Sequence, residues 1–293
     1  MEKLTALIKT MRPHQWTKNL VIFAALVFDR QLGFNNWTPL LRTIAGFLVF
    51  CLLSGTVYII NDIIDIEADR RHPKKRNRPI AAGQLSIRAA SVAALVLIVL
   101  LFPVSYALSP GFALVAYTYL GLNLVYSIWL KHVTLIDVFC IALFFVLRVG
   151  AGVTLIHVAR FSPWLYVVTT LGALYLGFGK RRAELALLAE DANAHRKVLD
   201  GYTIPLLDQL ITIVSSTTIV AYSLYTFSAP NLPANHIMML TIPFVLYGVF
   251  RYLYLIQVEN GGGAPDELLL TDRPLQATIL LWGLSVLLIF YIF

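Results

Sequence analysis

Long apolar runs separated by short polar breaks occupy the chain from residue 18 to its end. Each run approaches the roughly 20 residues that an α-helix needs to cross the hydrocarbon core of a bilayer. The pattern predicts an all-α integral membrane protein with nine spanning helices. Their expected bounds are 18–34, 41–61, 88–108, 111–130, 133–156, 163–180, 207–229, 236–257 and 275–293.

The breaks between the runs carry turn and helix-start signals. Ser-Pro-Gly at 109–111 predicts a tight connection, and Ser-Pro at 162–163 predicts a capped helix start with proline in the first turn. The glycine-rich segment at 261–265 predicts a flexible break, and Asp-Arg-Pro at 272–274 predicts the start of the last helix.

Residues 1–17 precede the first apolar run and contain no signal-peptide cleavage site. Leu4, Leu7, Ile8 and Met11 form one apolar helical stripe among polar neighbours. The stripe predicts an interfacial helix that lies on the membrane. Arg12, Trp16 and Lys18, which follow it, are adequately explained as membrane anchors.

Composition agrees with a membrane protein. The 293 residues are 58% hydrophobic and 13% charged, whereas soluble domains have roughly 45–50% apolar and about 25% charged residues. The net charge of +7 does not indicate nucleic-acid binding, because the basic residues lie in a few loops between spans. Cys51 and Cys140 lie inside apolar runs and are interpreted as small buried hydrophobic residues.

The basic residues also predict orientation. One side of the membrane receives 18 of the 23 lysines and arginines, and the other side receives three. Because cytoplasmic loops are enriched in Lys and Arg, we expect the N-terminus and the charged loops in the cytoplasm and the C-terminus outside. The protein is expected to be multi-pass in the cytoplasmic membrane of a bacterium or an archaeon.

The loop after the second expected span, residues 62–87, begins with a cluster of acids. Asn61, Asp62, Asp65 and Asp69 fall on one face if the helix continues through them. Their mutual repulsion favours a divalent cation, and Mg²⁺ prefers oxygen ligands together with substrate phosphates. We therefore predict that Asp62, Asp65 and Asp69 are metal ligands. Asp62 and Asp65 are also predicted to be catalytic residues, and Asn61 is predicted to bind substrate.

A basic run follows the acids in the same loop. Its side chains would hold a diphosphate beside the metal and stabilise it as it leaves. The alternative is an anchor that only keeps the loop in the cytoplasm, but acids on one helix face would weaken an anchor. The predicted substrate-binding residues of this run are Lys74, Lys75, Arg76 and Arg78.

The motif NDxxDxxxD, followed by a basic loop and Arg-Pro, resembles the first aspartate-rich motif of the UbiA superfamily of intramembrane prenyltransferases. The resemblance covers nearly the whole chain. It implies one catalytic domain over residues 1–293, with nine helices around a central cavity open to the cytoplasm. It also implies Mg²⁺ and a diphosphate substrate, with 62–87 and 180–206 as the catalytic loops.

The second loop departs from the usual superfamily pattern. Where a second aspartate-rich motif is typical, this chain has Lys180, Arg181, Arg182 and Glu184. Together with the segments MRPHQWTKNL and LTDRPLQ, this cation cluster resembles one branch, the decaprenyl-phosphate phosphoribosyltransferases. The branch implies transfer of 5-phosphoribose from 5-phosphoribosyl 1-diphosphate to a polyprenyl phosphate, for cell-wall arabinan precursors.

Within this interpretation Lys180 and Arg181 bind the ribose 5-phosphate or the acceptor phosphate. Glu184 pairs with Lys180 or contacts a ribose hydroxyl, and an ion pair that only orders the helix is equally compatible. All three are expected to be catalytic residues. The acceptor phosphate is already an anion at neutral pH, so the reaction requires no strong base.

Further substrate-binding candidates lie near span ends. Arg148 lies inside the fifth expected span, where a phosphate, a first-loop aspartate or a buried carboxylate could be its partner. Tyr126 and Lys131, with Asn123, lie at the end of the fourth span. Tyr202 precedes the seventh span, and Arg251 lies near the end of the eighth. A position at the membrane interface is the alternative explanation of each.

Two alternatives remain at this stage. One is a UbiA-type prenyltransferase that acts on an aromatic acceptor, against which the missing second aspartate motif argues. The other is a polytopic transporter or lipid flippase, which would place its charges near the bilayer midplane. The expected partners are 5-phosphoribosyl 1-diphosphate, a polyprenyl phosphate and membrane lipids, without nucleic acid; a homo-oligomer is compatible with the sequence.

Overall fold

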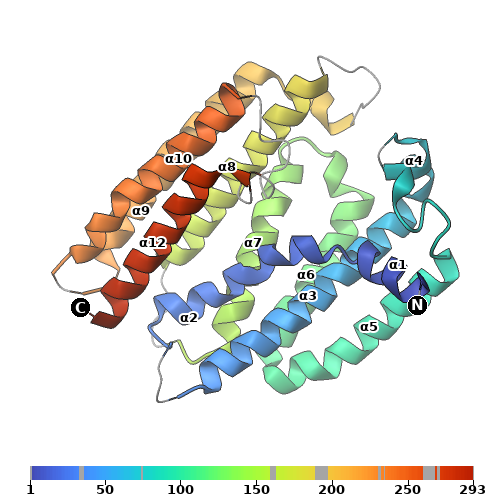
Figure 1. Ribbon diagram of the computed structural model, residues 1–293, viewed down its shortest axis with the longest axis horizontal. Coiled ribbons are helices and arrows are strands. Elements are labelled where there is room, and N and C mark those ends of the chain that lie inside the picture. The colour runs from blue at the N-terminus through green and yellow to red at the C-terminus, as the bar shows by residue number, and fades with distance from the viewer. Residues whose placement is uncertain are drawn as a thin grey trace. The chain divides into compact units, whose positions relative to one another are not determined.

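The computed structural model describes residues 2–32, 36–73, 75–158, 163–188, 197–229, 232–233, 235–259, 268 and 271–292. Every regular element in these ranges is helical (Figure 1). The long α-helices are α3 (Thr38–Ile64), α5 (Ile87–Leu108), α6 (Pro110–Ile128), α7 (Ile136–Leu155), α8 (Pro163–Leu188), α9 (Ile204–Ser228), α10 (Ile242–Gln257) and α12 (Arg273–Ile292). The shorter elements are α1 (Glu2–Thr10), α2 (Ala24–Phe28) and α4 (Ile66–Arg71), with 3-10 helices η1 (Pro13–Phe23), η2 (Lys75–Asn77), η3 (Leu130–His132), η4 (Lys197–Gly201) and η5 (Ile237–Thr241).

Seven helical segments of the described chain are long and apolar enough to cross a membrane. They are α3, α5, α6, α7, α9, η5 with α10, and α12. The prediction of an all-α multi-pass membrane protein is thereby confirmed, whereas the count of nine is not. The sixth expected span corresponds to α8, whose 26 residues include the charged segment 180–184 and which is not among the seven.

The first expected span differs from the prediction. The structure has η1 and α2 in place of one helix over 18–34, and α2 ends at Phe28. Asn19 is fully buried and donates from Nδ2 to Ser54 Oγ at 3.2 Å and to Cys51 Sγ at 3.4 Å. A polar side chain that bonds to α3 in this way belongs to a packed segment, not to a lipid-facing helix.

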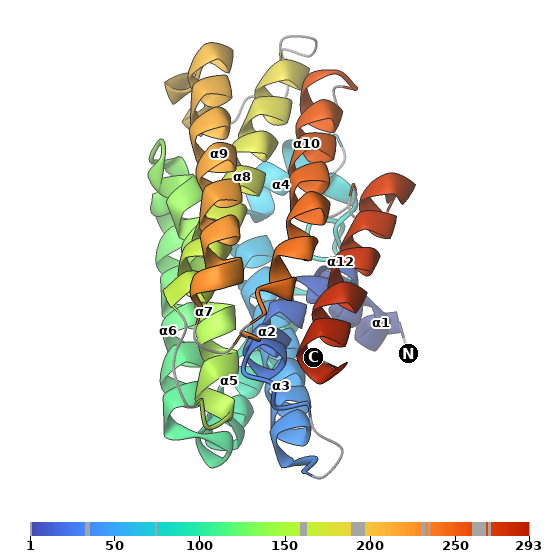
Figure 2. The same cartoon turned by 90° about the vertical axis from the view of Figure 1, so that its left-hand side faces the viewer.

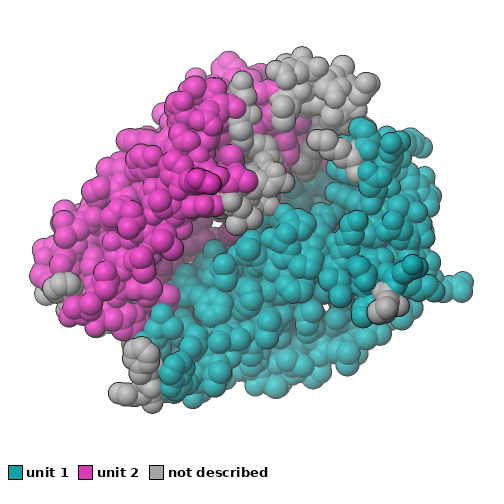
Figure 3. All heavy atoms as spheres, viewed as in Figure 1, with its two compact units in different colours: residues 1–26, 31–131, 147–158 teal, residues 27–30, 132–146, 159–293 magenta. Residues whose placement is uncertain are grey.

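The chain forms two compact units, coloured separately in Figure 3. Unit 1 comprises 1–26, 31–131 and 147–158. One of its cores joins α1, α3 and α5 through Ala6, Met11, Ile59, Ile80 and Ala90. The predicted N-terminal helix therefore exists and packs on α3 with part of its surface, while Leu4 and Ile8 stay exposed.

Unit 2 comprises 27–30, 132–146 and 159–293. Its helices α8, α9 and α10 lie side by side in Figures 1 and 2, and their contacts agree. Val138, from the first half of α7, packs into the core that these helices share with Phe178, Leu207 and Tyr252. A second core joins α9 to α12 through Tyr222 and Phe290, among others.

Several helices start where the turn signals predict. Pro110 and Pro163 open α6 and α8. Asp272 precedes α12 and accepts a hydrogen bond from Leu275 N at 2.9 Å, so its carboxylate caps the helix. Thr203 caps α9 in the same way, with Leu206 N donating to Oγ1 at 3.3 Å. Ser162 and the segment 261–265 lie outside the described residues.

Gly152 marks a close backbone approach inside unit 1. A Cβ at this position of α7 would meet the carbonyl oxygen of Ile22, and also lie 3.0 Å from its carbonyl carbon. Both neighbours are backbone atoms of η1, so neither can rotate away. A Cβ at Gly150, two residues earlier, would meet nothing within 4 Å.

We expect Gly152→Ala to destabilise the protein by about 1–3 kcal/mol, because the added methyl group forces η1 and α7 apart. Thermal unfolding of the purified protein in detergent measures the effect. Gly150→Ala is the matched control and should be neutral or slightly stabilising, since alanine favours the helix. Equal unfolding temperatures for the two variants would contradict the proposed contact.

Candidate active site

The acidic motif lies at a helix break, not on one continuous helix. α3 ends at Ile64, Asp65 has φ −91° and ψ 9°, and α4 begins at Ile66. The expectation of one continuous helix through the motif is therefore wrong, although Asp65 N and Asp69 N still donate to the carbonyl oxygens four residues earlier. Asp65 pairs with a different cation from the one that the other two acids share.

Asp62 and Asp69 are held together by one arginine of the basic loop. Arg78 Nη1 lies 3.2 Å from Asp62 Oδ1 and 2.6 Å from Asp69 Oδ2. The two carboxylates are 2% and 4% exposed, whereas the Arg78 side chain is 27% exposed. Because a single nitrogen contacts both carboxylates, their oxygens lie close enough to share a cation.

Arg12 is a second counter-ion, which the sequence interpretation assigned to membrane anchoring. Its Nη2 lies 2.5 Å from Asp62 Oδ1, and its guanidinium lies 4.6 Å from the centre of the Tyr58 ring. The backbone of Arg12 has φ 52° and ψ 65°, a left-handed conformation that costs an L-residue about 1–2 kcal/mol. The fold thus holds a strained backbone where the side chain reaches Asp62.

The remaining residues of the motif bond to the end of α6 and to η3. Lys131 Nζ donates to Asp65 Oδ1 at 2.8 Å, so a predicted substrate-binding residue contacts the motif. Ser127 Oγ donates to Asn61 Oδ1, fixing the amide oxygen. Asp65 therefore lies beside Lys131, and Asn61 lies beside Ser127, a residue that the sequence analysis did not consider.

Further substrate-binding candidates of unit 1 differ in exposure. Lys75 and Arg76 lie exposed on η2, and Tyr126 is half-buried on α6. Lys74 lies outside the described residues. Their predicted contacts with substrate stay predictions.

The oxygen donors of the motif fit a hard divalent cation. In the part of the chain that the structure describes, no three His, Cys, Asp or Glu side chains gather as a ready metal site. Asp62 and Asp69 nevertheless supply two buried carboxylates within reach of one cationic nitrogen, which is the donor type that Mg²⁺ prefers. Asp65, paired with Lys131, stays a predicted ligand.

In unit 2 the predicted phosphate ligand Arg181 is buried in a network of acids. It is 1% exposed, and its Nε donates to Asp137 Oδ2 at 2.7 Å. Its Nη1 donates to Glu184, three residues further along α8. Asp137 is fully buried at the start of α7. Arg181 therefore joins α7 to α8, and its predicted phosphate contact stays a prediction.

Tyr202 completes this network. Its hydroxyl donates to Asp137 Oδ1 at 2.7 Å and accepts from Leu135 N at 2.8 Å. Tyr202 is 4% exposed. Burial, and then the hydrogen bond to the Asp137 carboxylate, raise the pKa of Tyr202 above its ordinary value. The hydroxyl therefore stays protonated. It binds Oδ1 of the Asp137 carboxylate, whereas Arg181 binds Oδ2.

The other cations of unit 2 discussed above lie within α8 and α10. Lys180 is half-buried on α8. Arg182 donates to Asp208 Oδ1 of α9 at 2.6 Å and to the carbonyl oxygen of Ile256 at 2.8 Å. Arg251 contacts both oxygens of Asp272, at 2.7 Å and 3.2 Å. Hydrogen bonds from Arg251 lower the pKa of Asp272, so this pair ties α10 to the start of α12.

Arg148, the arginine inside an expected span, bonds to neutral groups of unit 1. It donates from Nε to Asn19 Oδ1 at 2.8 Å and from Nη2 to the Tyr119 hydroxyl at 2.8 Å, and it is 7% exposed. Its guanidinium also lies 4.8 Å from the centre of the Tyr119 ring. The sequence interpretation considered phosphate and carboxylate partners, and it overlooked the amide and phenol.

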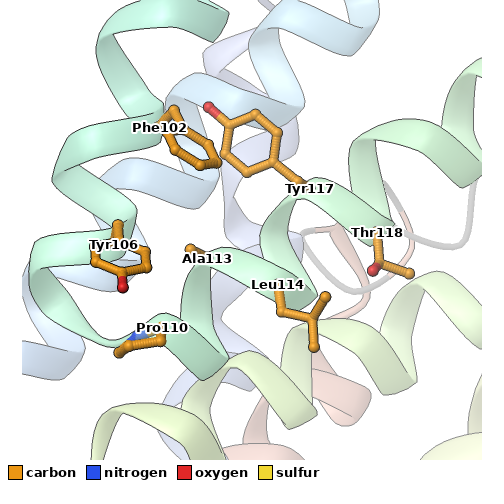
Figure 4. Close-up of a pocket in the computed structure, with 7 residues that line it drawn as sticks. All are labelled: Phe102, Tyr106, Pro110, Ala113, Leu114, Tyr117 and Thr118. Atoms are coloured by element: carbon orange, nitrogen blue, oxygen red, sulfur yellow. The ribbon is translucent and has the colours of Figure 1, made fainter.

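A groove of about 470 Å³ lies between α5 and α6 (Figure 4). Its walls carry no charged side chain, so it offers no ligand for a metal or a diphosphate. Phe102 and Tyr106 are exposed apolar side chains on α5, the face that a lipid would cover. The residues that line it are Phe102, Tyr106, Pro110, Ala113, Leu114, Tyr117 and Thr118.

Comparison with known proteins identifies the family of this chain. The sequence profile of the UbiA prenyltransferase family matches residues 20–268. The chain belongs to this UbiA prenyltransferase family. Membership makes it a membrane transferase and removes the transporter alternative.

Relatives cover almost the whole of this UbiA protein. It is 34% identical over 289 residues to the decaprenyl-phosphate phosphoribosyltransferase of Corynebacterium glutamicum, covering 98% of this chain and 87% of the relative. It is 32% identical over 286 residues to the protein of the same name from Mycobacterium tuberculosis, covering 97% and 93%. These matches confirm the resemblance that the motifs suggest.

Solved structures agree on the fold of the UbiA protein. A UbiA homolog from Archaeoglobus fulgidus bound to DMAPP and Mg²⁺ has a TM-score of 0.73 at 20% identity, covering 96% of this chain and 98% of that chain. A digeranylgeranylglyceryl phosphate synthase structure has a TM-score of 0.69 at 16% identity and covers both chains fully.

Besides Ser127, sequence reasoning missed Arg12 and Asp137 in this UbiA protein. Arg12 lies 50 positions before Asp62, and a basic residue beside a tryptophan is typical of a membrane anchor. Asp137 did carry a usable signal, because an acid at the start of an apolar run requires a partner. Pairing it with Arg181 requires knowledge of how α7 packs on α8.

We expect Tyr202→Phe to lower the free energy of unfolding by about 1.5–3 kcal/mol, because a buried carboxylate loses a hydrogen bond. Ionisation of Tyr202 is disfavoured in the folded protein, so its contribution is complete below about pH 10 and is lost as the pH rises further. Unfolding of the wild type and of Tyr202→Phe between pH 7 and pH 11 measures the difference in their free energies of unfolding. This difference should become smaller above pH 10.

The exposed Tyr166 provides the control, and Tyr166→Phe should leave stability unchanged. If Tyr202→Phe unfolds like the wild type but binds substrate more weakly, Tyr202 is a substrate ligand, as the sequence predicts, and the structural role is wrong.

Proposed function

We propose that this UbiA family member transfers 5-phosphoribose from 5-phosphoribosyl 1-diphosphate to a polyprenyl phosphate. The observation that carries the proposal is the buried carboxylate pair beside basic side chains, in a chain whose near-full-length relatives are named decaprenyl-phosphate phosphoribosyltransferase. The cation-rich start of the second loop supports a substrate set with two phosphorylated groups. The product would be a polyprenyl-phosphoryl 5-phosphoribose, a precursor for cell-wall arabinan.

The reaction breaks the bond between the anomeric carbon and the diphosphate and forms a bond to an oxygen of the lipid phosphate. Asp62 and Asp69 are the residues that would hold Mg²⁺, with Asp65 as a further ligand. The bound ion would supply Lewis-acid stabilisation of the departing diphosphate. Arg78 and the exposed cations of η2 bind the diphosphate oxygens and keep the donor in place.

The acceptor needs positioning more than activation. Its phosphate is an anion at neutral pH, so it attacks the anomeric carbon without a base. Lys180 is the half-buried cation that we assign to one of the phosphates in unit 2. Glu184, held by Arg181, is the carboxylate that we assign to a ribose hydroxyl.

The charge distribution supports a cytoplasmic location for this chemistry. The loops that contain the proposed ligands also contain most of the lysines and arginines, which retain loops in the cytoplasm. 5-Phosphoribosyl 1-diphosphate is a soluble, highly charged donor, so a site on that side receives it without crossing the membrane. The N-terminus would be cytoplasmic as well.

A turnover assay on the purified protein in detergent tests the reaction. Radiolabelled 5-phosphoribosyl 1-diphosphate and polyprenyl phosphate should give a labelled lipid with Mg²⁺ and none with a chelator. Asp62→Asn should lower the rate by about 100-fold or more, because it removes a carboxylate that holds the metal. The control Glu67→Gln alters an exposed acid of α4 that pairs with Arg70 and should retain full activity.

A folded preparation that produces no labelled lipid would refute phosphoribosyl transfer. Transfer from an isoprenyl diphosphate to an aromatic acceptor by the same preparation would establish the prenyltransferase alternative. Folding is checked independently by the unfolding temperature, so inactivity and misfolding are distinguished.

We expect Lys180→Ala to weaken apparent binding of the phosphorylated sugar or of the lipid phosphate by about 10-fold or more, since a charged hydrogen bond is lost. Steady-state kinetics with each substrate varied in turn identifies the phosphate concerned. Lys180→Arg retains the charge and should recover part of the loss, while Lys3→Ala on α1 should have no effect. Unchanged kinetics in Lys180→Ala would show that this phosphate ligand is misplaced.

A further inference from the structure

The carboxylates of the acidic motif and their counter-ions differ in exposure. Asp62 and Asp69 are almost completely buried, at 2% and 4% side-chain exposure. Arg12 and Arg78, which neutralise them, are 23% and 27% exposed. The cations are therefore more accessible to solvent than the carboxylates that they neutralise.

The charges of this cluster match those of a single divalent cation. Two guanidinium groups carry the charge of one Mg²⁺ or Mn²⁺, and they use Asp62 Oδ1 and Asp69 Oδ2. A metal ion that bound the same oxygens would lie beside two positive charges. Because buried like charges repel strongly, metal and arginines compete for these carboxylates.

We propose that Arg12 and Arg78 exchange partners during the catalytic cycle. They neutralise Asp62 and Asp69 while no divalent cation is bound, and they move to the phosphate oxygens of a diphosphate when a cation takes the carboxylates. The inference rests on the proposed function only in taking a diphosphate-bearing substrate. It makes both arginines substrate ligands and balances the charge of the two carboxylates when they hold no cation.

The backbone around Arg78 allows its side chain to move alone. Arg78 N donates to the carbonyl oxygen of Lys75 at 2.9 Å, and its own carbonyl accepts from Ala82 N at 2.8 Å. The next residues, Pro79 and Ile80, are buried in unit 1. A fixed backbone with a partly exposed guanidinium permits a change of partner without refolding of the loop.

The backbone around Arg12 is fixed as well. It lies between α1 and Pro13, and its left-handed backbone is adopted although the residue is not glycine. Strained backbone of this kind concentrates at functional sites, where the surrounding structure enforces it. Arg12 N also donates to the carbonyl oxygen of Lys9 at 3.2 Å, which holds the turn.

The exchange predicts effects of opposite sign on two ligands. Loss of an arginine removes a competitor of the metal, so the metal alone should bind more tightly. The same loss removes a ligand of the diphosphate, so diphosphate should bind the metal-loaded protein more weakly. A purely structural role would weaken both, because it would disorder the carboxylates.

The test measures binding without turnover. Mn²⁺ binding to the purified protein is followed by electron paramagnetic resonance, and radiolabelled inorganic diphosphate is then bound at saturating Mn²⁺. We expect Arg78→Gln to bind Mn²⁺ about 10-fold more tightly and diphosphate about 10-fold more weakly, each equivalent to about 1.4 kcal/mol. Arg12→Gln should shift both in the same directions.

Arg70→Gln is the matched control for net charge. Arg70 lies on neighbouring α4 in an exposed pair with Glu67, at 2.9 Å. Its loss should change neither affinity by more than about 2-fold, since exposed charges are screened by solvent and salt. If Arg78→Gln proves unstable, Arg78→Lys is measured in its place. It retains the charge, so both affinities should stay close to those of the wild type.

Weaker or unchanged Mn²⁺ binding in folded Arg78→Gln and Arg12→Gln would overturn the inference, as would unchanged diphosphate binding. An equal shift in Arg70→Gln would reduce the effect to net charge and would also overturn it. Neither assay uses phosphoribose or lipid. Failure of phosphoribosyl transfer with both binding shifts intact would therefore refute the proposed function alone.

Discussion

Charge inside a membrane-spanning helix bundle has to be neutralised by neighbouring side chains, because little water is present to solvate it. This protein buries Asp62, Asp69 and Asp137 almost completely. Each contacts at least one guanidinium group, and the arginines come from other segments of the chain. These ion pairs tie the ends of the helices together and decide where the reactive side chains lie.

The same constraint gives the two units different characters. In unit 1 the arginines of the carboxylate pair are partly exposed, so a ligand can reach them. In unit 2 Arg181 is enclosed by Asp137 and Glu184, and Tyr202 binds the remaining oxygen. The first arrangement suits reversible binding of ions, and the second suits a structural link between α7 and α8. A basic cluster in sequence can therefore serve two purposes.

Periodicity and charge were sufficient to predict the helical membrane fold and the acidic loop, and the resemblance of the motifs indicated the family. The apolar runs set the helices, and the spacing of Asp62, Asp65 and Asp69 indicated metal chemistry. The break at Asp65 was not predictable, since nothing in the local sequence forbids a continuous helix. Arg12 and Asp137 were missed because their partners lie 50 and 44 residues away, where only tertiary packing brings them together.

Arg12 follows directly after α1, which packs on α3 while Leu4 and Ile8 face outwards. The position of this short helix therefore helps to determine where the Arg12 guanidinium lies relative to Asp62. A change in the chain before Arg12 is therefore expected to alter the electrostatics of the carboxylate pair, which lies 50 positions further along the chain. The N-terminal helix thus influences the reaction centre indirectly, through Arg12, although the helix itself contributes no ligand.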